Sequence, residues 1–154
     1  MNFRITGLPA ENFSHLFALD DAELAALGAV RRTAEHAAPC RISLTDATPG
    51  DEVILVNYEH HAVDSPYRMR FAIFVRAGEA TYDRVGEIPE QLRKRQLAAR
   101  AFDSDGMMIA FQLVEGAKLE DAIGLLLSDP RAEYLHLHYA APGCYAARVE
   151  RAQG

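Results

Sequence analysis

The sequence predicts an α+β fold with a mostly antiparallel sheet of about seven or eight strands and three short helices. Segments with the apolar or alternating pattern of strands recur along the chain. Turn residues such as Pro49-Gly50 and Pro142-Gly143 separate them, and the run from Asp103 to Gly106 is typical of a hairpin turn. Only three segments have helical spacing or helix-capping residues. Strands joined by short turns favour an antiparallel sheet.

The expected strands begin with Phe3 to Leu8, which Pro9 ends. Val53 to Tyr58 is apolar on both alternating faces except at Asn57, as in a central strand covered on both sides. Leu97 to Phe102 would also fit the end of a helix, but the hairpin turn that follows favours a strand. The other expected strands are Arg41 to Leu44, Phe71 to Val75, Met107 to Val114, Tyr134 to Tyr139 and Cys144 to Arg151.

Three short helices are expected between these strands. In the first, Asp20 and Glu23 have the spacing of a reciprocal capping box. Leu24 and Leu27 supply its apolar face, and Gly28 ends it. The second helix is expected from Pro89 to about Arg95, and the third over Leu119, Ala122, Ile123 and Leu126, ended by Asp129-Pro130.

Length and composition indicate one domain that covers residues 1–154. The chain is 49% hydrophobic and 25% charged, close to the average of soluble domains. Its 16 Lys and Arg against 22 Asp and Glu give a net charge of −6, so no nucleic-acid partner is expected. The apolar runs are strand-sized and the N-terminus lacks the apolar centre of a signal peptide. We therefore expect a cytoplasmic protein with no membrane contact.

The two cysteines, Cys40 and Cys144, are expected to be free, buried thiols, because a chain without an export signal meets reducing conditions. Neither belongs to a C-x-x-C pair. Arg41 follows Cys40, and an adjacent cation lowers the pKa of a thiol, so a Cys–His nucleophile is the alternative. No catalytic signature surrounds either cysteine, which favours structural thiols.

The fingerprints of several enzyme classes are missing from the sequence. It contains no G-x-x-x-x-G-K-[ST], no G-x-G-x-x-G after a strand, no H-E-x-x-H and no G-x-S-x-G. This disfavours P-loop enzymes, dinucleotide oxidoreductases, zincins and α/β-hydrolases. The sequence assigns no cofactor.

The most specific local signal is the run Tyr134-Leu135-His136-Leu137-His138-Tyr139. Alternate residues of a strand share a face, so His136 and His138 are expected to point one way and the leucines the other. A following hairpin loop of two or four residues has consequences for the next strand. Tyr145 and Ala147 would then flank the histidines, and Cys144 and Arg148 would lie on the leucine face.

Three interpretations of this histidine pair are open. The rings are half-exposed sheet residues that bond to neighbours, or they line a polar ligand pocket, or they supply two ligands of a metal ion. A metal site needs a third ligand. The candidates are His60, His61, Glu59 and Asp64, all near the end of the central strand.

The tract after the central strand is a second candidate for function. Adjacent strand residues face opposite ways, so at most one of His60 and His61 is expected to join a given site. The polar tract from His60 to Arg70 contains Tyr67 and connects two buried strands. A loop in that position is a suitable binding surface, and a plain surface connection is the alternative.

Arg100 is a third candidate, because it lies inside an expected strand between two alanines. A charged side chain there needs a partner. That partner is either a carboxylate of the chain, Asp103 or Glu115, or an anionic ligand.

Several motifs along the chain are similar to those of one known family. In the first half they are Pro39 to Leu44, Asp46-Ala47, Gly50 to Glu52 and Leu55 to Tyr58. In the second half they are Ser65 to Tyr67, Ile73 to Val75, Pro89 with Arg93 and Arg95, Arg100 to Asp103, Glu133-Tyr134 with His136 and His138, and Gly143 to Tyr145. With these motifs the chain resembles a bacterial family catalogued as domain of unknown function 1203. Ala72 departs from the pattern, which has a small residue followed by proline there. The resemblance implies a self-contained domain and assigns no activity.

The sequence thus favours binding of a small polar or anionic ligand, by a binding protein or an enzyme. The pocket would be lined by His136, His138, Tyr145 and Arg100, with the loop from His60 to Tyr67 over it. In an enzyme, one histidine with a pKa of about 6.5 would act as general acid or base while Arg100 held the anion. The alternatives are a homo-oligomeric interaction module without catalysis, which would use an exposed sheet edge or the final hairpin, and a metal-binding protein built on His136 and His138.

Overall fold

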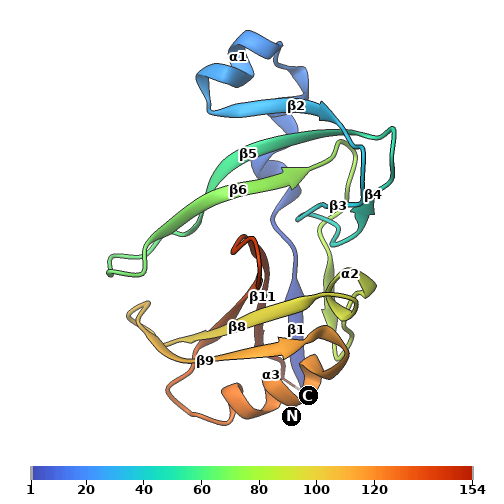
Figure 1. Cartoon of the computed structure of the whole chain (residues 1–154). Coiled ribbons are helices and arrows are strands. Elements are labelled where there is room, and N and C mark those ends of the chain that lie inside the picture. Colours follow the sequence, from blue (N-terminus) through green and yellow to red (C-terminus); the bar gives the residue numbers. More distant parts are fainter. Residues whose placement is uncertain (1, 154) are drawn as a thin grey trace.

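A six-stranded antiparallel sheet is the frame of the structure, a computed structural model that describes residues 2–153 (Figure 1). The strand order is β7-β1-β11-β10-β8-β9, so the strand that carries the histidine pair lies near the middle. The strands are β1 (Phe3–Thr6), β7 (Asp83–Val85), β8 (Gln96–Phe102), β9 (Met108–Glu115), β10 (Tyr134–Tyr139) and β11 (Tyr145–Arg151).

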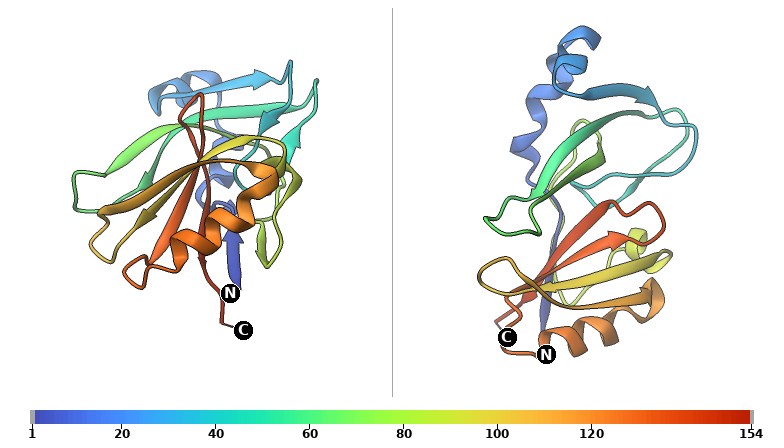
Figure 2. Two further views of the ribbon diagram at one scale, coloured as in Figure 1. Left: turned by 60° about the horizontal axis from the view of Figure 1, so that its bottom comes forward. Right: turned by 60° about the vertical axis from the view of Figure 1, so that its left-hand side comes forward.

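A smaller antiparallel sheet, in the order β2-β5-β6, lies over one face of the larger one (Figures 1 and 2). Its strands are β2 (Ala29–Thr33), β5 (Glu52–His61) and β6 (Met69–Val75). A two-stranded ribbon of β3 (Ala38–Pro39) and β4 (Asp46–Ala47) lies between β2 and β5 in the sequence. The two sheets therefore form the walls of an interior layer that the histidines enter.

Three short α-helices complete the fold: α1 (Asp21–Ala26), α2 (Glu90–Arg93) and α3 (Leu119–Leu127). Short 3-10 helices cover Ala10–Asn12, Ser14–Ala18 and Gly116–Lys118. The capping box before α1 is present, because Glu23 N donates to Asp20 Oδ1 at 2.8 Å and Asp20 N donates to Glu23 Oε1 at 3.1 Å. Within residues 2–153, none of these helices is long and apolar enough to cross a bilayer.

The main apolar core lies between α3 and the six-stranded sheet. Leu119 and Ile123 of α3 pack there with Leu135 and Leu137 of β10, all of them fully buried. Figure 2 shows α3 on the face opposite the smaller sheet. Because strand residues alternate, the leucines of β10 face α3 and the histidines between them face the smaller sheet. A second cluster joins the N-terminal helical segments to β5 and β6.

The α+β class and the mainly antiparallel sheets are confirmed, as are the strand at residues 96–102 and the three helices. The prediction for Arg41 to Leu44 is wrong: this segment is a turn, and Leu44 has a φ of +55°. Its backbone bonds go to separate segments instead of one ladder, since Arg41 N donates to Phe74 O and Tyr82 N donates to Ile42 O. Leu27 is exposed at the end of α1, so only Leu24 forms the buried face. The strands β2, β3, β4 and β7 were not expected.

Candidate functional site

Four histidines from the two sheets meet in the layer between them. His136 and His138 come from β10, and His60 and His61 come from the end of β5. The ring centroids of His60 and His138 are 5.3 Å apart, those of His61 and His136 are 4.9 Å apart, and those of His60 and His136 are 6.1 Å apart. The cluster joins residues far apart in the sequence.

An irregularity in β5 brings both of its histidines to the cluster. Tyr58 pairs with Phe71 and His61 pairs with Met69, so the residues between Tyr58 and His61 outnumber those opposite on β6. A bulge of this kind breaks the alternation of side chains. The prediction that at most one of His60 and His61 joins a given site is therefore wrong.

A second bulge lies in the final hairpin and changes the faces expected for β11. His138 pairs with Tyr145, but Leu137 pairs with Ala147 and His136 with Arg148. Tyr145 thus flanks the histidines as expected. Arg148 was expected on the leucine face and instead lies on the histidine face, where its Cζ is 4.0 Å from the ring centroid of Tyr134.

The histidines line a small cavity. The cavity measures about 20 Å³ and is lined by His60, His61, Tyr67, Met69, Arg100, Phe102, Met108, His136 and His138. A space of this size holds about one water molecule. Five of the six expected ligand-binding residues line it. Tyr145, the sixth, does not line it, but its ring stacks on His136 with centroids 4.9 Å apart and planes 14° apart.

Hydrogen bonds fix the tautomers of two of the rings. His61 Nδ1 lies 2.8 Å from the Tyr67 carbonyl oxygen, which only accepts, so Nδ1 carries the proton and Nε2 accepts the Tyr134 hydroxyl at 2.6 Å. His138 Nδ1 likewise donates to the Gly143 carbonyl at 3.0 Å, which leaves the lone pair of His138 on Nε2. His61 is fully bonded, and His138 has one nitrogen left to accept a proton or a hydrogen bond.

The other two rings have buried nitrogens without partners. Both ring nitrogens of His60 and Nδ1 of His136 have no hydrogen-bond partner within residues 2–153. An unpaired buried polar atom costs about 1–3 kcal/mol. A water-sized polar species in the cavity would offset that cost.

Burial keeps the imidazoles of His60, His136 and His138 neutral. It lowers the pKa of His60 to about 4 and that of His138 to about 3, and neighbouring positive charge adds to the effect. The pKa of His136 is also lowered well below its usual value, mainly by burial. The expected general acid or base with a pKa of about 6.5 is therefore not found among these three rings.

Among the residues that the structure describes, Arg100 lines this cavity without a carboxylate partner. It lies directly opposite His136 in the pairing of β8 with β10. Neither Asp103 nor Glu115 pairs with it, and the one side-chain hydrogen bond of Arg100 within the described chain joins Nη1 to the sulfur of Met69, at 3.9 Å. Burial alone lowers the pKa of its guanidinium. The carboxylate expected as the ordinary partner of Arg100 is absent from residues 2–153.

The loop between β5 and β6 is held over the cavity by the turn between β8 and β9. Ser65 Oγ donates to the Gly106 carbonyl at 2.9 Å. Gly106 has a φ of +74°, and a Cβ placed on it would lie 2.8 Å from Cβ of Val63. Of the residues between β5 and β6, Tyr67 lines the cavity, and its carbonyl accepts the bond from His61.

Sequence reasoning missed four lining or supporting residues: Phe102, Met69, Met108 and Tyr134. The ring of Phe102 lies 4.2 Å from that of His61 and 5.4 Å from that of His136. Phe102 and Tyr134 face each other in the pairing of β8 with β10. Strand alternation in the sequence places Phe102 on the face of Arg100 and Tyr134 on the face of His136, so both could have been predicted. No pattern in the sequence indicates that Met69 and Met108 line the cavity.

The metal interpretation lacks a complete ligand set. Although His60 and His61 do approach the pair on β10, no group of three or more His, Cys, Asp or Glu side chains within residues 2–153 is arranged to hold a metal ion. His61 also uses both ring nitrogens in hydrogen bonds.

The cysteines are free and buried, as expected. The hypothesis of an activated thiol at Cys40 is wrong, because burial raises its pKa to about 11 and outweighs the lowering effect of Arg41.

Comparison with known proteins identifies the family. No curated protein and no solved structure matches the chain. A family described as "Protein of unknown function (DUF1203)" matches residues 37–151. This range contains the whole histidine cavity and more than half of the chain. The chain therefore belongs to the DUF1203 family.

Proposed function

We propose that this protein binds a small anion at Arg100, with one polar atom of the ligand in the histidine cavity. One observation carries the proposal: a half-buried arginine with no carboxylate partner among residues 2–153 lines the same cavity as three neutral imidazoles. A guanidinium supplies several donors in a plane that matches a carboxylate or phosphate group. The cation of the site is thus available to a ligand.

The imidazoles limit the kind of anion. His138 presents Nε2 as an acceptor, so a ligand atom near it must carry a hydrogen. His60 has two unpaired ring nitrogens, one donor and one acceptor when neutral. A ligand with both an anionic oxygen and a hydroxyl group fits this set. Glycolate, bicarbonate and hydrogen phosphate have that chemistry.

A bound anion would also allow an imidazole of the site to act as a general acid or base. A negative charge beside a neutral imidazole favours its protonated form and raises its pKa. In the free protein the pKa of His138 is about 3, so a bound anion moves it toward the range where it exchanges a proton near neutral pH. An enzymatic role for His138 therefore depends on occupancy of the Arg100 site.

Thermal-shift and calorimetric titrations with glycolate, bicarbonate and phosphate test the proposal, with chloride at equal ionic strength as the reference. A ligand that binds only the folded protein raises the melting temperature. Arg100→Gln should weaken binding by about 10–100-fold, since it removes a charged hydrogen bond of about 1.5–3 kcal/mol. Arg70→Gln is the matched control, because Arg70 is an exposed arginine on β6 that bonds Asn57. Equal binding by the Arg100→Gln variant, or no binding of any of these anions, contradicts the proposal.

We also propose self-association as a second candidate, on a different observation. Phe111 and Leu113 of the edge strand β9 are 76% and 64% exposed, and both lie on one face of the strand. Apolar side chains on an open edge strand are typical of pairing surfaces. Light scattering after size exclusion should then give a dimer that Phe111→Lys dissociates. Leu125→Lys on α3 is the control, since Leu125 is equally exposed on the opposite side of the sheet. A monomer at all concentrations contradicts this candidate.

A further inference from the structure

A second cavity, at the end of the interior layer near the final hairpin turn, contains a buried arginine that the proposed function does not use. This cavity measures about 470 Å³, which is within the range of small-molecule sites. Of the described residues, it shares none with the lining of the histidine cavity. Its walls are mostly apolar and come from β3, β6 and the turn after β10. The lining includes Pro39, Phe71, Phe74, Tyr139, Ala141 and Pro142.

Arg41 is the buried cation of this cavity. It is 1% exposed, and its Nε donates to the Tyr145 carbonyl at 2.7 Å while Nη1 donates to the Pro39 carbonyl. Its Cζ lies 5.0 Å from the ring centroid of Tyr139. No carboxylate of residues 2–153 forms an ion pair with it, and burial lowers the pKa of its guanidinium. A buried charge with only neutral partners is costly to a folded protein.

A second arginine adds to the positive charge. Arg95 lines the same cavity, and its Cζ lies 5.2 Å from the ring centroid of Tyr139. Arg95 shares the carboxylate of Asp46 with Lys94, at 3.0 and 2.8 Å. Two cations, Arg95 and Lys94, therefore share one carboxylate, and no acidic side chain is among the described residues that line the cavity.

We propose that this cavity binds a monocarboxylate with an apolar body, such as an aryl or short alkyl acid. The carboxylate would meet Arg41 and Arg95, and the apolar body would lie against Phe71 and Phe74. Phe71 is 45% exposed in the free protein, so a bound apolar group removes it from water. The buried guanidinium of Arg41 favours a ligand with a carboxylate, and the apolar walls favour a ligand with a hydrocarbon body.

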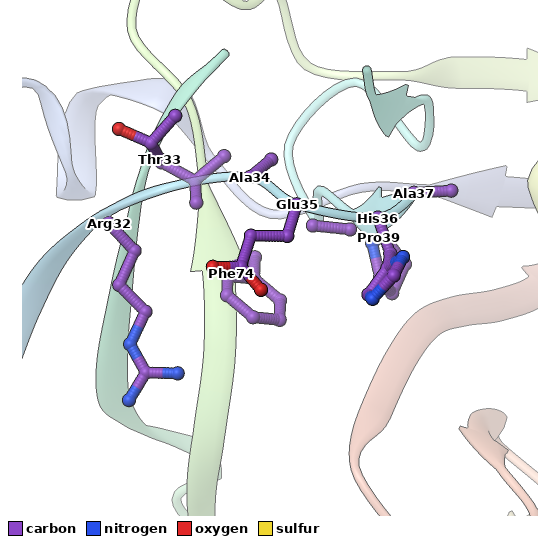
Figure 3. A pocket seen from close by; sticks show the side chains of 10 residues that line it. Arg32, Thr33, Ala34, Glu35, His36, Ala37, Pro39 and Phe74 are labelled. Carbon is purple, nitrogen blue, oxygen red and sulfur yellow. The ribbon is translucent and has the colours of Figure 1, made fainter. Parts of the chain in front are cut away.

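A neighbouring cavity of about 590 Å³ does not have the same character (Figure 3). It shares Ala37, Pro39 and Phe74 with the arginine cavity, but its charged side chains, Arg32 and Glu35, are exposed and of opposite sign. Nothing buried there demands an anion, so the proposal applies to the cavity of Arg41.

The chain has no tryptophan, which makes a site-specific reporter possible. In a Phe71→Trp variant of the full chain, titration with 3-phenylpropionate and hexanoate should change the tryptophan fluorescence in a saturable way. The uncharged 3-phenylpropionamide should bind at least about tenfold more weakly, which corresponds to about 1.4 kcal/mol for the lost charge. Equal binding of acid and amide, or no saturable binding of either acid at millimolar concentrations, overturns the proposal.

Three variants keep the test independent of folding and of the first site. Arg41→Met should abolish the preference for acid over amide, and circular dichroism shows whether it folds. Ala141→Trp, at an exposed rim position, should block both acids without removing a buried group, as measured by calorimetry. Arg100→Gln should bind both acids as the wild type does. Loss of binding in that variant would assign the acids to the histidine cavity and overturn the proposal for this one.

Discussion

The hydroxyl of Tyr134 donates to Nε2 of His61 at 2.6 Å and so links β10 to the end of β5. The bond is buried and joins residues 73 positions apart. The other ring nitrogen of His61, Nδ1, donates to the Tyr67 carbonyl, and within residues 2–153 the Tyr134 hydroxyl is the only partner of Nε2. This contact connects the two sheets at the wall of the histidine cavity.

Removal of this hydroxyl should destabilise the protein. Tyr134→Phe leaves a buried imidazole nitrogen without a partner, and we expect the free energy of unfolding to fall by about 1–3 kcal/mol. Urea denaturation at neutral pH measures the change. Tyr82→Phe is the control, since the Tyr82 hydroxyl donates to the Glu87 carbonyl at an exposed site. A loss no greater than that of the control would mean that the bond is unimportant for stability.

Stability should decrease as the pH falls from about 6.5 to 5. The unfolded rings take up protons near pH 6.5, whereas burial lowers the pKa of folded His138 to about 3 and that of folded His136 well below 6.5. In this window the unfolded state binds more protons, so acid favours unfolding. The pKa of folded His60 is lowered to about 4, so three such rings give a slope of up to about 4 kcal/mol per pH unit.

Urea denaturation of the wild type at pH values between 5 and 7 tests this slope. His138→Asn should reduce it, because asparagine retains a donor for the Gly143 carbonyl but does not titrate. His36→Asn should leave the slope unchanged, since His36 is exposed on the surface. A flat profile in the wild type would contradict the neutral state assigned to the buried rings.

The turn at Gly106 should tolerate alanine less well than a turn of the same backbone conformation elsewhere. Gly106 and Gly78 both have a φ of +74°, so the strain of alanine is the same at each, about 1–2 kcal/mol. Only at Gly106 would the new Cβ meet Val63, at 2.8 Å. Gly106→Ala should therefore lower the melting temperature more than Gly78→Ala does. Val63→Ala in the Gly106→Ala background should recover part of the difference, because it removes the two Cγ atoms at 2.9 and 3.0 Å while the Cβ contact stays. An equal loss in Gly106→Ala and Gly78→Ala would contradict a role for this contact.

Anion binding at Arg100 should be accompanied by proton uptake. A bound negative charge raises the pKa of the neighbouring imidazoles, so affinity is expected to rise as the pH falls from 8 toward 5. Calorimetry with glycolate in buffers of different ionisation enthalpy measures the number of protons taken up. In His138→Asn this number should be smaller. An affinity independent of pH, with no proton uptake, would indicate that the imidazoles stay neutral in the complex.

Much of this architecture was predictable from local patterns. The capping box at Asp20, the hairpin after Phe102 and the common face of His136 and His138 each depend on neighbouring residues only. The turn at Arg41 was not predictable, since its backbone bonds go to Phe74 and to segments around Leu8 and Tyr82. Long-range partners of this kind leave no periodic signal in the sequence.

The candidate site was predicted in its members but not in its geometry. Arg100 and the histidine pair were found from single residues in strands, and the structure brings them to one cavity. Both bulges were invisible, because they depend on how two strands pair and not on either strand alone. These bulges determine which face of its strand His61 and Arg148 each occupy. The buried environment, which displaces the pKa of these rings from the expected value, also comes from packing between sheets.

The bulge before His61 makes the composition of the cavity depend on residue count as well as residue type. Deleting one position between Tyr58 and His61 would restore strict alternation, and only one imidazole of the pair could then enter the interior. Relatives with the same two histidines but one residue fewer would thus carry a different inner surface. In this protein, an insertion or deletion at that point changes the chemistry of the layer without replacing any side chain in it.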